Sequence, residues 1–272
     1  MIGFLAAAAI ASATPTPPPA SVPASAINAD PAIFVVHDTD TTVYIFGTFH
    51  ALDVKTQWFN DEVKDAFDKS DELVLETLLP EGPPKPGTAL AAPPVPLRMP
   101  VASSASFLAT TRMAINAGRS QGMQASNGAD MVLRRIAEEQ GKPVEGLESL
   151  QTQLNMFSRM PATAPAAPPR PGAPVAAAPM ASLSKSMAEM QSAWKRGDQS
   201  VFVRMLGQVE RSSPDMYRMM FVERNAHFAE WIASRMQKPG TIFVAVGAGH
   251  LAGKDSVLVR LAERGIESAR LN

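Results

Sequence analysis

Two glycine–histidine turns in this chain have the residue types and the spacing that chemistry requires. Gly47-Thr48-Phe49-His50 and Gly247-Ala248-Gly249-His250 each follow a β-rich run and place a histidine three residues after a glycine. Ligands bind at strand ends in α/β sheets, and a glycine there lets another group approach the backbone closely. A histidine in that place can offer a ring nitrogen to a metal ion or act as an acid or base. One such histidine alone would be interpreted as hydrogen-bonding its own turn, but two in equivalent settings indicate a functional centre.

Glu76 is the carboxylate that could complete a site with these two histidines. It ends the apolar run Leu73-Val74-Leu75, and carboxylates are rarely buried unless they are paired or bind a metal ion. Two histidines and one carboxylate leave metal positions open for water and substrate, and a metal-bound water is a nucleophile near neutral pH. The alternative is a glutamate at a strand end that simply reaches solvent.

Arg224 is the candidate for a supporting positive charge. It lies inside the long helical stretch 214–236, from which it could orient a carboxylate or stabilise an oxyanion. Alternatively, it is a solvated helix arginine paired with Glu223 or Glu230.

The remaining polar candidates are interpreted as structural. Glu148 could cap the helix that follows it or reach the rim of the sheet, and Asp130 could serve as a charge at a helix N-terminus. His37 falls in the first predicted strand and His227 on a helix, and both are expected to be structural or surface residues.

Composition and missing motifs exclude several classes of function. The chain lacks cysteine, which excludes disulfides, zinc–thiolate sites and a cysteine nucleophile. It contains no Gly-x-Ser-x-Gly elbow, His-Glu-x-x-His helix or phosphate-binding Gly-x-x-x-x-Gly-Lys-Ser/Thr loop. A net charge of −1 gives no basic excess for nucleic acid or for an anionic membrane surface.

The hydrophobic pattern predicts an α/β protein with a mixed central β-sheet, opened by an N-terminal β-hairpin and flanked by helices. The hairpin strands are 33–37 and 42–46, and the further strands are predicted at 73–76, 143–147, 241–246 and 266–271. Helices are predicted at 56–69, 104–118, 129–140, 148–156, 182–196, 198–207, 214–236 and 254–264. The methionines of the second half are expected to fill the core and not to bind metal.

The domain organisation is predicted as one α/β domain over residues 31–272, preceded by a leader and a linker. Residues 1–13 resemble the apolar region and cleavage site of a signal peptide, although no Lys or Arg precedes them, and 14–30 read as a disordered linker. We therefore expect export, to the periplasm or the envelope, with no transmembrane span beyond this leader. Proline-rich inserts at about 80–100 and 161–180 are expected to be disordered and free of helix and central strand.

The ordered motifs of the chain resemble those of the TraB/GumN family, relatives of the Tiki metalloproteases. The resemblance runs from about residue 31 to 272 and rests on the segments 43–50, 73–76, 142–149, Gln153, 222–225 and 244–253. It implies a fold shared with ChaN-like and erythromycin-esterase-like proteins. It also implies a site formed by His50, His250 and Glu76 with Arg224 in support. Ser149 and Gly249 depart from the common Thr and Ala of the family, and neither is a proposed ligand.

Three hypotheses follow for the function. The first is a metal-dependent hydrolase, most simply a peptidase acting on a peptide or protein. In it His50, His250 and Glu76 hold a divalent ion (Mn²⁺, Co²⁺ or Zn²⁺), and Arg224 steadies the developing oxyanion. The second is a non-catalytic envelope protein that binds a peptide, haem or a polysaccharide-assembly partner. The third is a pseudoenzyme whose histidines only form turns, in which case the three side chains should point apart. A shared metal requires them to converge within about 5 Å, since Zn–N and Zn–O bonds are only ~2 Å.

Overall fold

A computed structural model describes residues 27–78, 116–158 and 177–272, and it confirms the predicted α/β class. Six strands form one mixed sheet in the order β6-β5-β7-β3-β2-β8, and β1 pairs separately with β4. The strands are β1 (Ile27–Asn28), β2 (Ile33–His37), β3 (Thr41–Thr48), β4 (Thr56–Gln57), β5 (Glu72–Thr77), β6 (Val144–Glu148), β7 (Gly240–Gly247) and β8 (Ala269–Arg270). The α-helices are α1 (Asp61–Lys69), α3 (Ala129–Glu139), α4 (Leu150–Ser158), α5 (Ala177–Trp194), α6 (Ser200–Ser212), α7 (Pro214–Tyr217), α8 (Glu223–Arg235) and α9 (Val257–Ala262).

The sheet is parallel through its centre and antiparallel at one side. β6, β5, β7 and β3 run in one direction, with β7 paired to both β3 and β5. β2 pairs antiparallel with β3 and with β8, so the predicted opening hairpin is confirmed. β7 is apolar at nearly every position, as expected for a central parallel strand that is buried on both faces.

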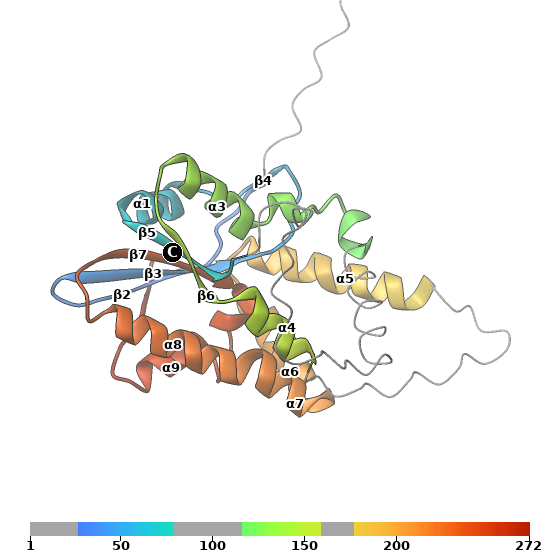
Figure 1. Cartoon of the computed structure of the whole chain (residues 1–272). Coiled ribbons are helices and arrows are strands. Elements are labelled where there is room, and N and C mark those ends of the chain that lie inside the picture. Colours follow the sequence, from blue (N-terminus) through green and yellow to red (C-terminus); the bar gives the residue numbers. More distant parts are fainter. Residues whose placement is uncertain (1–26, 79–115, 159–176) are drawn as a thin grey trace, which may run out of the picture.

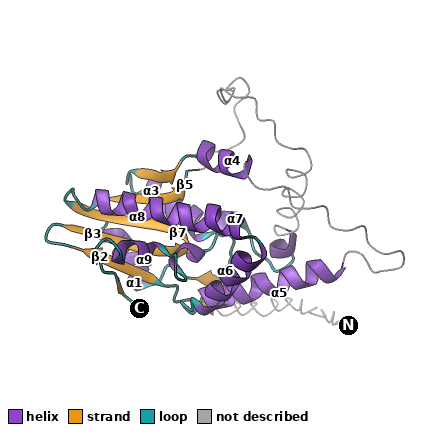
Figure 2. Cartoon of the chain, turned by 90° about the horizontal axis from the view of Figure 1, so that it is seen from below, coloured by secondary structure: helices purple, strands orange, loops and turns teal. Residues whose placement is uncertain are grey.

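Helices cover both faces of this sheet (Figures 1 and 2). Along β7, Phe243 and Ala245 pack into a core formed with α1, α3, α5 and α6. The alternate residues Ile242 and Val244 pack into a second core formed with α8 and α9. The period of two in β7 therefore distributes its side chains between two layers of helices.

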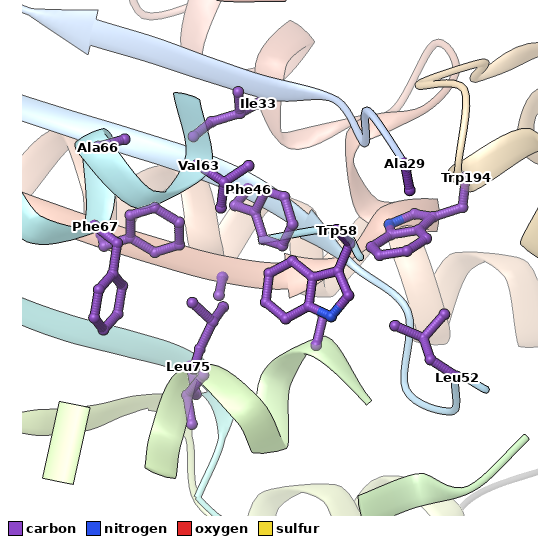
Figure 3. Packing of buried hydrophobic residues seen from close by; sticks show 14 of the residues in the cluster. Ala29, Ile33, Phe46, Leu52, Trp58, Val63, Ala66, Phe67, Leu75 and Trp194 are labelled. Atoms are coloured by element: carbon purple, nitrogen blue, oxygen red, sulfur yellow. The ribbon is translucent and has the colours of Figure 1, made fainter. Parts of the chain in front are cut away.

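Aromatic rings fill the first of these cores (Figure 3). Phe46 of β3 stacks on Trp58 with ring centroids 5.5 Å apart, and it meets Trp194 of α5 edge-on at 6.5 Å. The indole Nε1 of Trp194 donates a 2.7 Å hydrogen bond to the carbonyl of Gly47. This hydrogen bond fixes α5 against Gly47, the glycine of the turn that follows β3.

Asp53 makes a second connection between α5 and the loop that follows β3. Its carboxylate accepts hydrogen bonds from Lys195 Nζ at 2.9 Å, Gln191 Nε2 at 3.2 Å and Thr56 Oγ1 at 2.8 Å. Burial alone would raise the pKa of Asp53, but the hydrogen bonds and the positive charge of Lys195 lower that pKa below its usual value. The ion pair therefore favours the ionised carboxylate in the folded chain.

Several predicted element boundaries differ from the structure for identifiable reasons. The predicted helix 56–69 begins at Asp61, because Asn60 Oδ1 accepts the Val63 N–H as an N-cap. A π-helical turn, η2 (Arg218–Val222), interrupts the predicted helix 214–236 between α7 and α8. The predicted helix 254–264 shortens to α9, and the predicted strand 266–271 shortens to β8.

Two of the segments predicted to be disordered overlap described elements at one end. β1 falls inside the predicted linker 14–30, where it pairs with β4. α5 starts inside the predicted insert 161–180, because Pro179 lies in its first turn, where a missing N–H costs no helical hydrogen bond. The leader 1–13, the insert 80–100 and residues 104–115 of a predicted helix lie outside the described residues. Within the described ranges no helix is long and apolar enough to cross a membrane.

Candidate functional site

All the predicted site residues meet at one edge of the sheet, where β3, β5, β6 and β7 have their carboxyl ends. His50 follows β3 by two residues, and Glu76 is the penultimate residue of β5. His250 lies in the single turn η3 (Ala248–Leu251) directly after β7. Glu148 ends β6, and Arg224 reaches the same edge from the start of α8. Parallel strands bring these ends together, because neighbouring strands stop at one rim of the sheet.

Gly247, the last residue of β7, marks the point on which three side chains converge. A Cβ placed on Gly247 would lie 3.1 Å from His50 Nε2, 3.2 Å from Glu76 Oε2 and 3.6 Å from His250 Cδ2. The backbone of Gly247 has φ −53° and ψ 136°, which any residue can adopt. Gly247 is therefore required for the space that its missing side chain leaves and not for its conformation.

His250 is held rigidly, with one ring nitrogen directed toward its charged neighbours. Its Nδ1 lies 2.5 Å from Asn225 Oδ1, and its ring lies between Phe221 and Phe228 with centroids 5.3 and 5.2 Å away. Its Nε2 lies 3.2 Å from Arg224 NH1, a group that can only donate. This hydrogen-bond network assigns the proton to Nδ1 and leaves the lone pair on Nε2.

Glu76 has both carboxylate oxygens engaged. Oε1 accepts a 2.6 Å hydrogen bond from Arg224 NH2 and lies 3.6 Å from His250 Nε2, while Oε2 accepts a 2.9 Å bond from the Gly247 N–H. Burial alone would raise the pKa of the Glu76 carboxyl, but the positive charges of Arg224 and His50 hold that pKa well below its usual range. Glu76 is therefore an anion in the folded chain, and the alternative of a glutamate that simply reaches solvent is wrong.

Arg224 joins two glutamates in a buried ion triad. Its Nε lies 3.0 Å from both oxygens of Glu148, and its NH2 donates to Glu148 Oε2 at 2.8 Å as well as to Glu76. The Arg224 side chain is 7% exposed, so the alternative of a solvated arginine paired with Glu223 or Glu230 is wrong. Burial alone would lower the pKa of Arg224, but the two glutamates raise it. Glu148 lies at the rim of the sheet, as one of its two predicted roles required.

The π-helical turn η2 lies immediately before Arg224 in the chain. Such turns occur frequently at functional sites. Here η2 supplies Phe221, which packs on the His250 ring, and the carbonyl of Met220, which accepts from Arg224 NH1 at 3.5 Å.

His50 is the open counterpart of His250. Its side chain is 63% exposed, and its Nδ1 lies 3.4 Å from Asp130 Oδ1 at the start of α3. Partial loss of solvent and the charge of Arg224 act to lower the pKa of His50, but Asp130 and then Glu76 raise it to about 9. Because the side chain is so exposed, water screens the ion pair and limits its contribution to stability.

A close backbone approach fixes the position of the His50 turn. A Cβ on Gly128 would lie only 2.4 Å from the carbonyl oxygen of His50 and 2.9 Å from Asp130 Oδ1. The N–H of Ala129 donates to the carbonyl of Phe49 at 3.0 Å. Gly128 therefore allows the N-terminus of α3 to lie directly against the turn, which brings Asp130 to the imidazole.

The other two histidines lie away from this point of convergence. His37 is exposed at the end of β2, opposite Thr42 at the start of β3, and therefore at the other edge of the sheet. His227 is exposed on α8, where its Nε2 lies 3.3 Å from the carbonyl of Leu147. Both fit the structural or surface role that the sequence predicts.

Sequence reasoning missed three contributors to this site. Asn225 was assigned no role, Asp130 was predicted only as a charge at a helix N-terminus, and Gly128 was not identified. The available signals were a polar residue next to a candidate arginine and a Gly-x-Asp sequence at a helix start. Neither signal identifies the histidine that each residue contacts, since those contacts join segments far apart in the chain.

The imidazole nitrogens and carboxylate oxygens of this site are atoms that coordinate divalent metal ions, but they do not have the geometry of a metal site. Atoms of two imidazoles and a carboxylate lie within 3.6 Å of a Cβ placed on Gly247, so the side chains do not point apart as the third hypothesis predicts. Within residues 27–78, 116–158 and 177–272, no group of three or more His, Asp or Glu side chains could hold a metal ion as it stands. Oε1 of Glu76 is bound to the Arg224 guanidinium instead.

Comparison with protein families gives a match. The sequence profile of the TraB/PrgY/gumN family matches residues 32–93 and 88–270, which include every residue of the site. No curated protein and no solved structure matches the chain. Since the profile covers most of the chain, from β2 to β8, this protein belongs to the TraB/PrgY/gumN family.

Proposed function

We propose that the chain is a metal-dependent hydrolase that cleaves peptide bonds at the edge defined by His50, Glu76 and His250. The observation that carries this proposal is the convergence of the three side chains on Gly247. The site lies where parallel sheets bind ligands, and it combines an open histidine, a buried histidine and an ionised carboxylate. The resemblance to Tiki metalloproteases supports peptide cleavage as the reaction.

The donor set fits a divalent ion in its chemistry. His50 Nε2, His250 Nε2 and a Glu76 oxygen would hold Mn²⁺, Co²⁺ or Zn²⁺, and these nitrogen and oxygen donors suit all three ions. The Nδ1 of each histidine already faces a separate partner, Asp130 for His50 and Asn225 for His250. Both Nε2 atoms face the site, where a metal ion would replace Arg224 NH1 at His250 and displace the proton that His50 carries at neutral pH. When bound, the ion would polarise the scissile carbonyl and lower the pKa of a coordinated water.

The side chains of the site would perform the remaining tasks. Arg224 would donate a hydrogen bond to the oxyanion that forms at the attacked carbonyl, because its guanidinium lies 3.2 Å from His250 Nε2. Glu148 would keep that guanidinium in place by accepting hydrogen bonds from its Nε and NH2 groups. Glu76 would serve as a ligand or, if it is not a full ligand, as the base that accepts a proton from the attacking water.

Metal binding and proteolysis, measured on the same variants, test this proposal. Purified protein should retain one equivalent of Mn²⁺, Co²⁺ or Zn²⁺ after dialysis and should then cleave an unfolded protein such as casein. The double variant His50→Ala, His250→Ala should lose both properties. His37→Ala is the matched control, because it removes an exposed histidine from the opposite edge of the sheet. Undiminished cleavage by the double variant would refute the proposal.

One observation favours a second function, that of a non-catalytic binding protein. Arg224 forms hydrogen bonds with both Glu76 and Glu148, so these groups are already paired without a metal ion. Such a site could bind a peptide, haem or a polysaccharide-assembly partner without turnover. Stoichiometric binding of one of these ligands, with no peptide cleavage in the presence of Mn²⁺, Co²⁺ or Zn²⁺, would favour this function over hydrolysis.

We further propose that the chain acts in the periplasm or envelope. The apolar run and the small-residue pattern in residues 1–13 support this location. Fractionation of cells that express the full chain, compared with a variant lacking 1–13, tests it. Recovery of both forms in the cytoplasm would contradict the proposal.

A further inference from the structure

Asn225 is the only side chain that contacts the inner nitrogen of His250 among the hydrogen bonds that the structure describes. The distance from Asn225 Oδ1 to His250 Nδ1 is 2.5 Å, and Asn225 itself is 1% exposed. A contact this short in a buried place joins one donor to one acceptor, because two lone pairs or two N–H groups would repel each other.

The orientation of the Asn225 amide is determined by its other end. Asn225 Nδ2 lies 2.7 Å from the carbonyl oxygen of Asp255, which can only accept a hydrogen bond. The amide nitrogen must therefore face Asp255, and the amide oxygen must face His250. It follows that His250 Nδ1 carries the hydrogen.

The carbonyl of Asp255 is itself held in place by its own side chain. The Asp255 carboxylate accepts a hydrogen bond from Tyr217 Oη at 2.9 Å and forms an ion pair with Arg260 of α9. Asp255 thus connects the end of α7, the start of α8 and α9. This anchoring limits the freedom of the Asn225 amide to rotate.

We infer that Asn225 is a positioning residue that sets the tautomer of His250, so that Nε2 presents its lone pair to the site. The proposed function gives this role its purpose, because a metal ligand or a base must have that nitrogen unprotonated. Phe221 and Phe228 hold the plane of the ring, whereas the Asn225 amide at Nδ1 and the Arg224 donor at Nε2 distinguish one ring nitrogen from the other.

The tautomer can be observed directly by ¹⁵N-histidine NMR on the metal-free protein at mildly alkaline pH. The sequence contains four histidines, so the signal of His250 is identified by its absence in His250→Ala. The wild type should show a protonated Nδ1 and an unprotonated Nε2. In Asn225→Leu both nitrogens should move toward the averaged shifts of a mixed population, while Asn225→Asp, which keeps the acceptor, should retain the wild-type pattern.

This readout needs neither metal nor turnover, so it separates the inference from the proposed function. A wild-type His250 with its proton on Nε2 would overturn the inference, even if Asn225→Leu does not fold. An unchanged pattern in a folded Asn225→Leu would also overturn it. Glu230→Ala, an exposed substitution on the same helix, is the matched control and should change nothing. At the proposed metal site, Asn225→Leu should also lose about 10–100-fold in metal affinity.

Discussion

Substituting Arg224 by methionine should destabilise the protein far more than a surface substitution, because it removes the guanidinium that pairs with two buried carboxylates. The side chains of Arg224, Glu76 and Glu148 are 7%, 14% and 5% exposed, so water cannot take over the lost hydrogen bonds. Removing one member of a buried ion pair costs about 3–5 kcal/mol. At roughly 2–4 °C per kcal/mol for a domain of this size, Tm should fall by on the order of 10 °C.

The double variant Arg224→Met, Glu148→Gln tests the electrostatic origin of this loss. Removing one of the two stranded charges should restore part of the stability, so the double variant should unfold at a higher denaturant concentration than Arg224→Met alone. The matched control is Arg218→Met. The Arg218 side chain is 64% exposed, and its surface pairs with Asp215 and Glu223 contribute about 0–1 kcal/mol.

Chemical unfolding of the four proteins, followed by circular dichroism, measures these differences. A loss below about 1 kcal/mol in Arg224→Met, equal to that of the control, would refute the buried triad. A double variant that is less stable than Arg224→Met would refute the electrostatic explanation and leave lost packing as the cause.

Three further predictions concern backbone approach and pH. Gly247→Ala should leave Tm nearly unchanged but lower kcat/KM by about 10²-fold, because the added methyl group displaces the ends of side chains within the site. The control is Gly249→Ala, whose added Cβ would contact only an aromatic ring edge at 3.4 Å. Equal activity of the two variants would contradict the prediction. Gly128→Ala should cost about 1–3 kcal/mol in the free energy of unfolding, because its Cβ would meet the backbone of His50; wild-type stability would show that this approach is not tight. Asp53→Asn should lower the free energy of unfolding at neutral pH. Since the pKa of Asp53 is lowered in the folded chain, its carboxylate stabilises the fold at pH values above the unfolded pKa, roughly 3.9, and this stabilisation disappears as pH falls through the folded-state pKa. A stability difference between wild type and Asp53→Asn that is independent of pH would contradict this.

The sheet and the location of the site could be predicted from sequence because both depend on local patterns. The apolar run 241–246 predicted the central strand β7, and the two β-rich runs 33–37 and 42–46 with a turn between them predicted the hairpin of β2 and β3. Parallel strands end at a common edge, so the residues at those ends, His50, Glu76 and His250, could be grouped before any geometry was known. The arrangement of these three residues around Gly247 follows from that topology.

The partners of these residues could not be predicted, because each contact joins segments that are distant in sequence. Glu148 could be placed at the rim of the sheet, but its pairing with Arg224 depends on how α8 packs across β6 and β5. The pairing of Asp130 with His50 depends on the approach that Gly128 allows. The break between α7 and α8 was missed, since the π-helical turn Arg218–Val222 contains no Gly or Pro that would mark it in the sequence.

The position of β7 between β3 and β5 has a consequence for how the chain matures. At about 5–20 residues per second, roughly 10–40 s of synthesis separates β3 from β7. During that interval β3 and β5 each have an open hydrogen-bonding edge, which is a template for aggregation. Because the last large strand of the sheet closes its centre, the newly made protein folds late, in a step dominated by long-range pairing. His50 and Glu76 therefore become neighbours only when β7 is inserted, and the site cannot exist in a partly made chain.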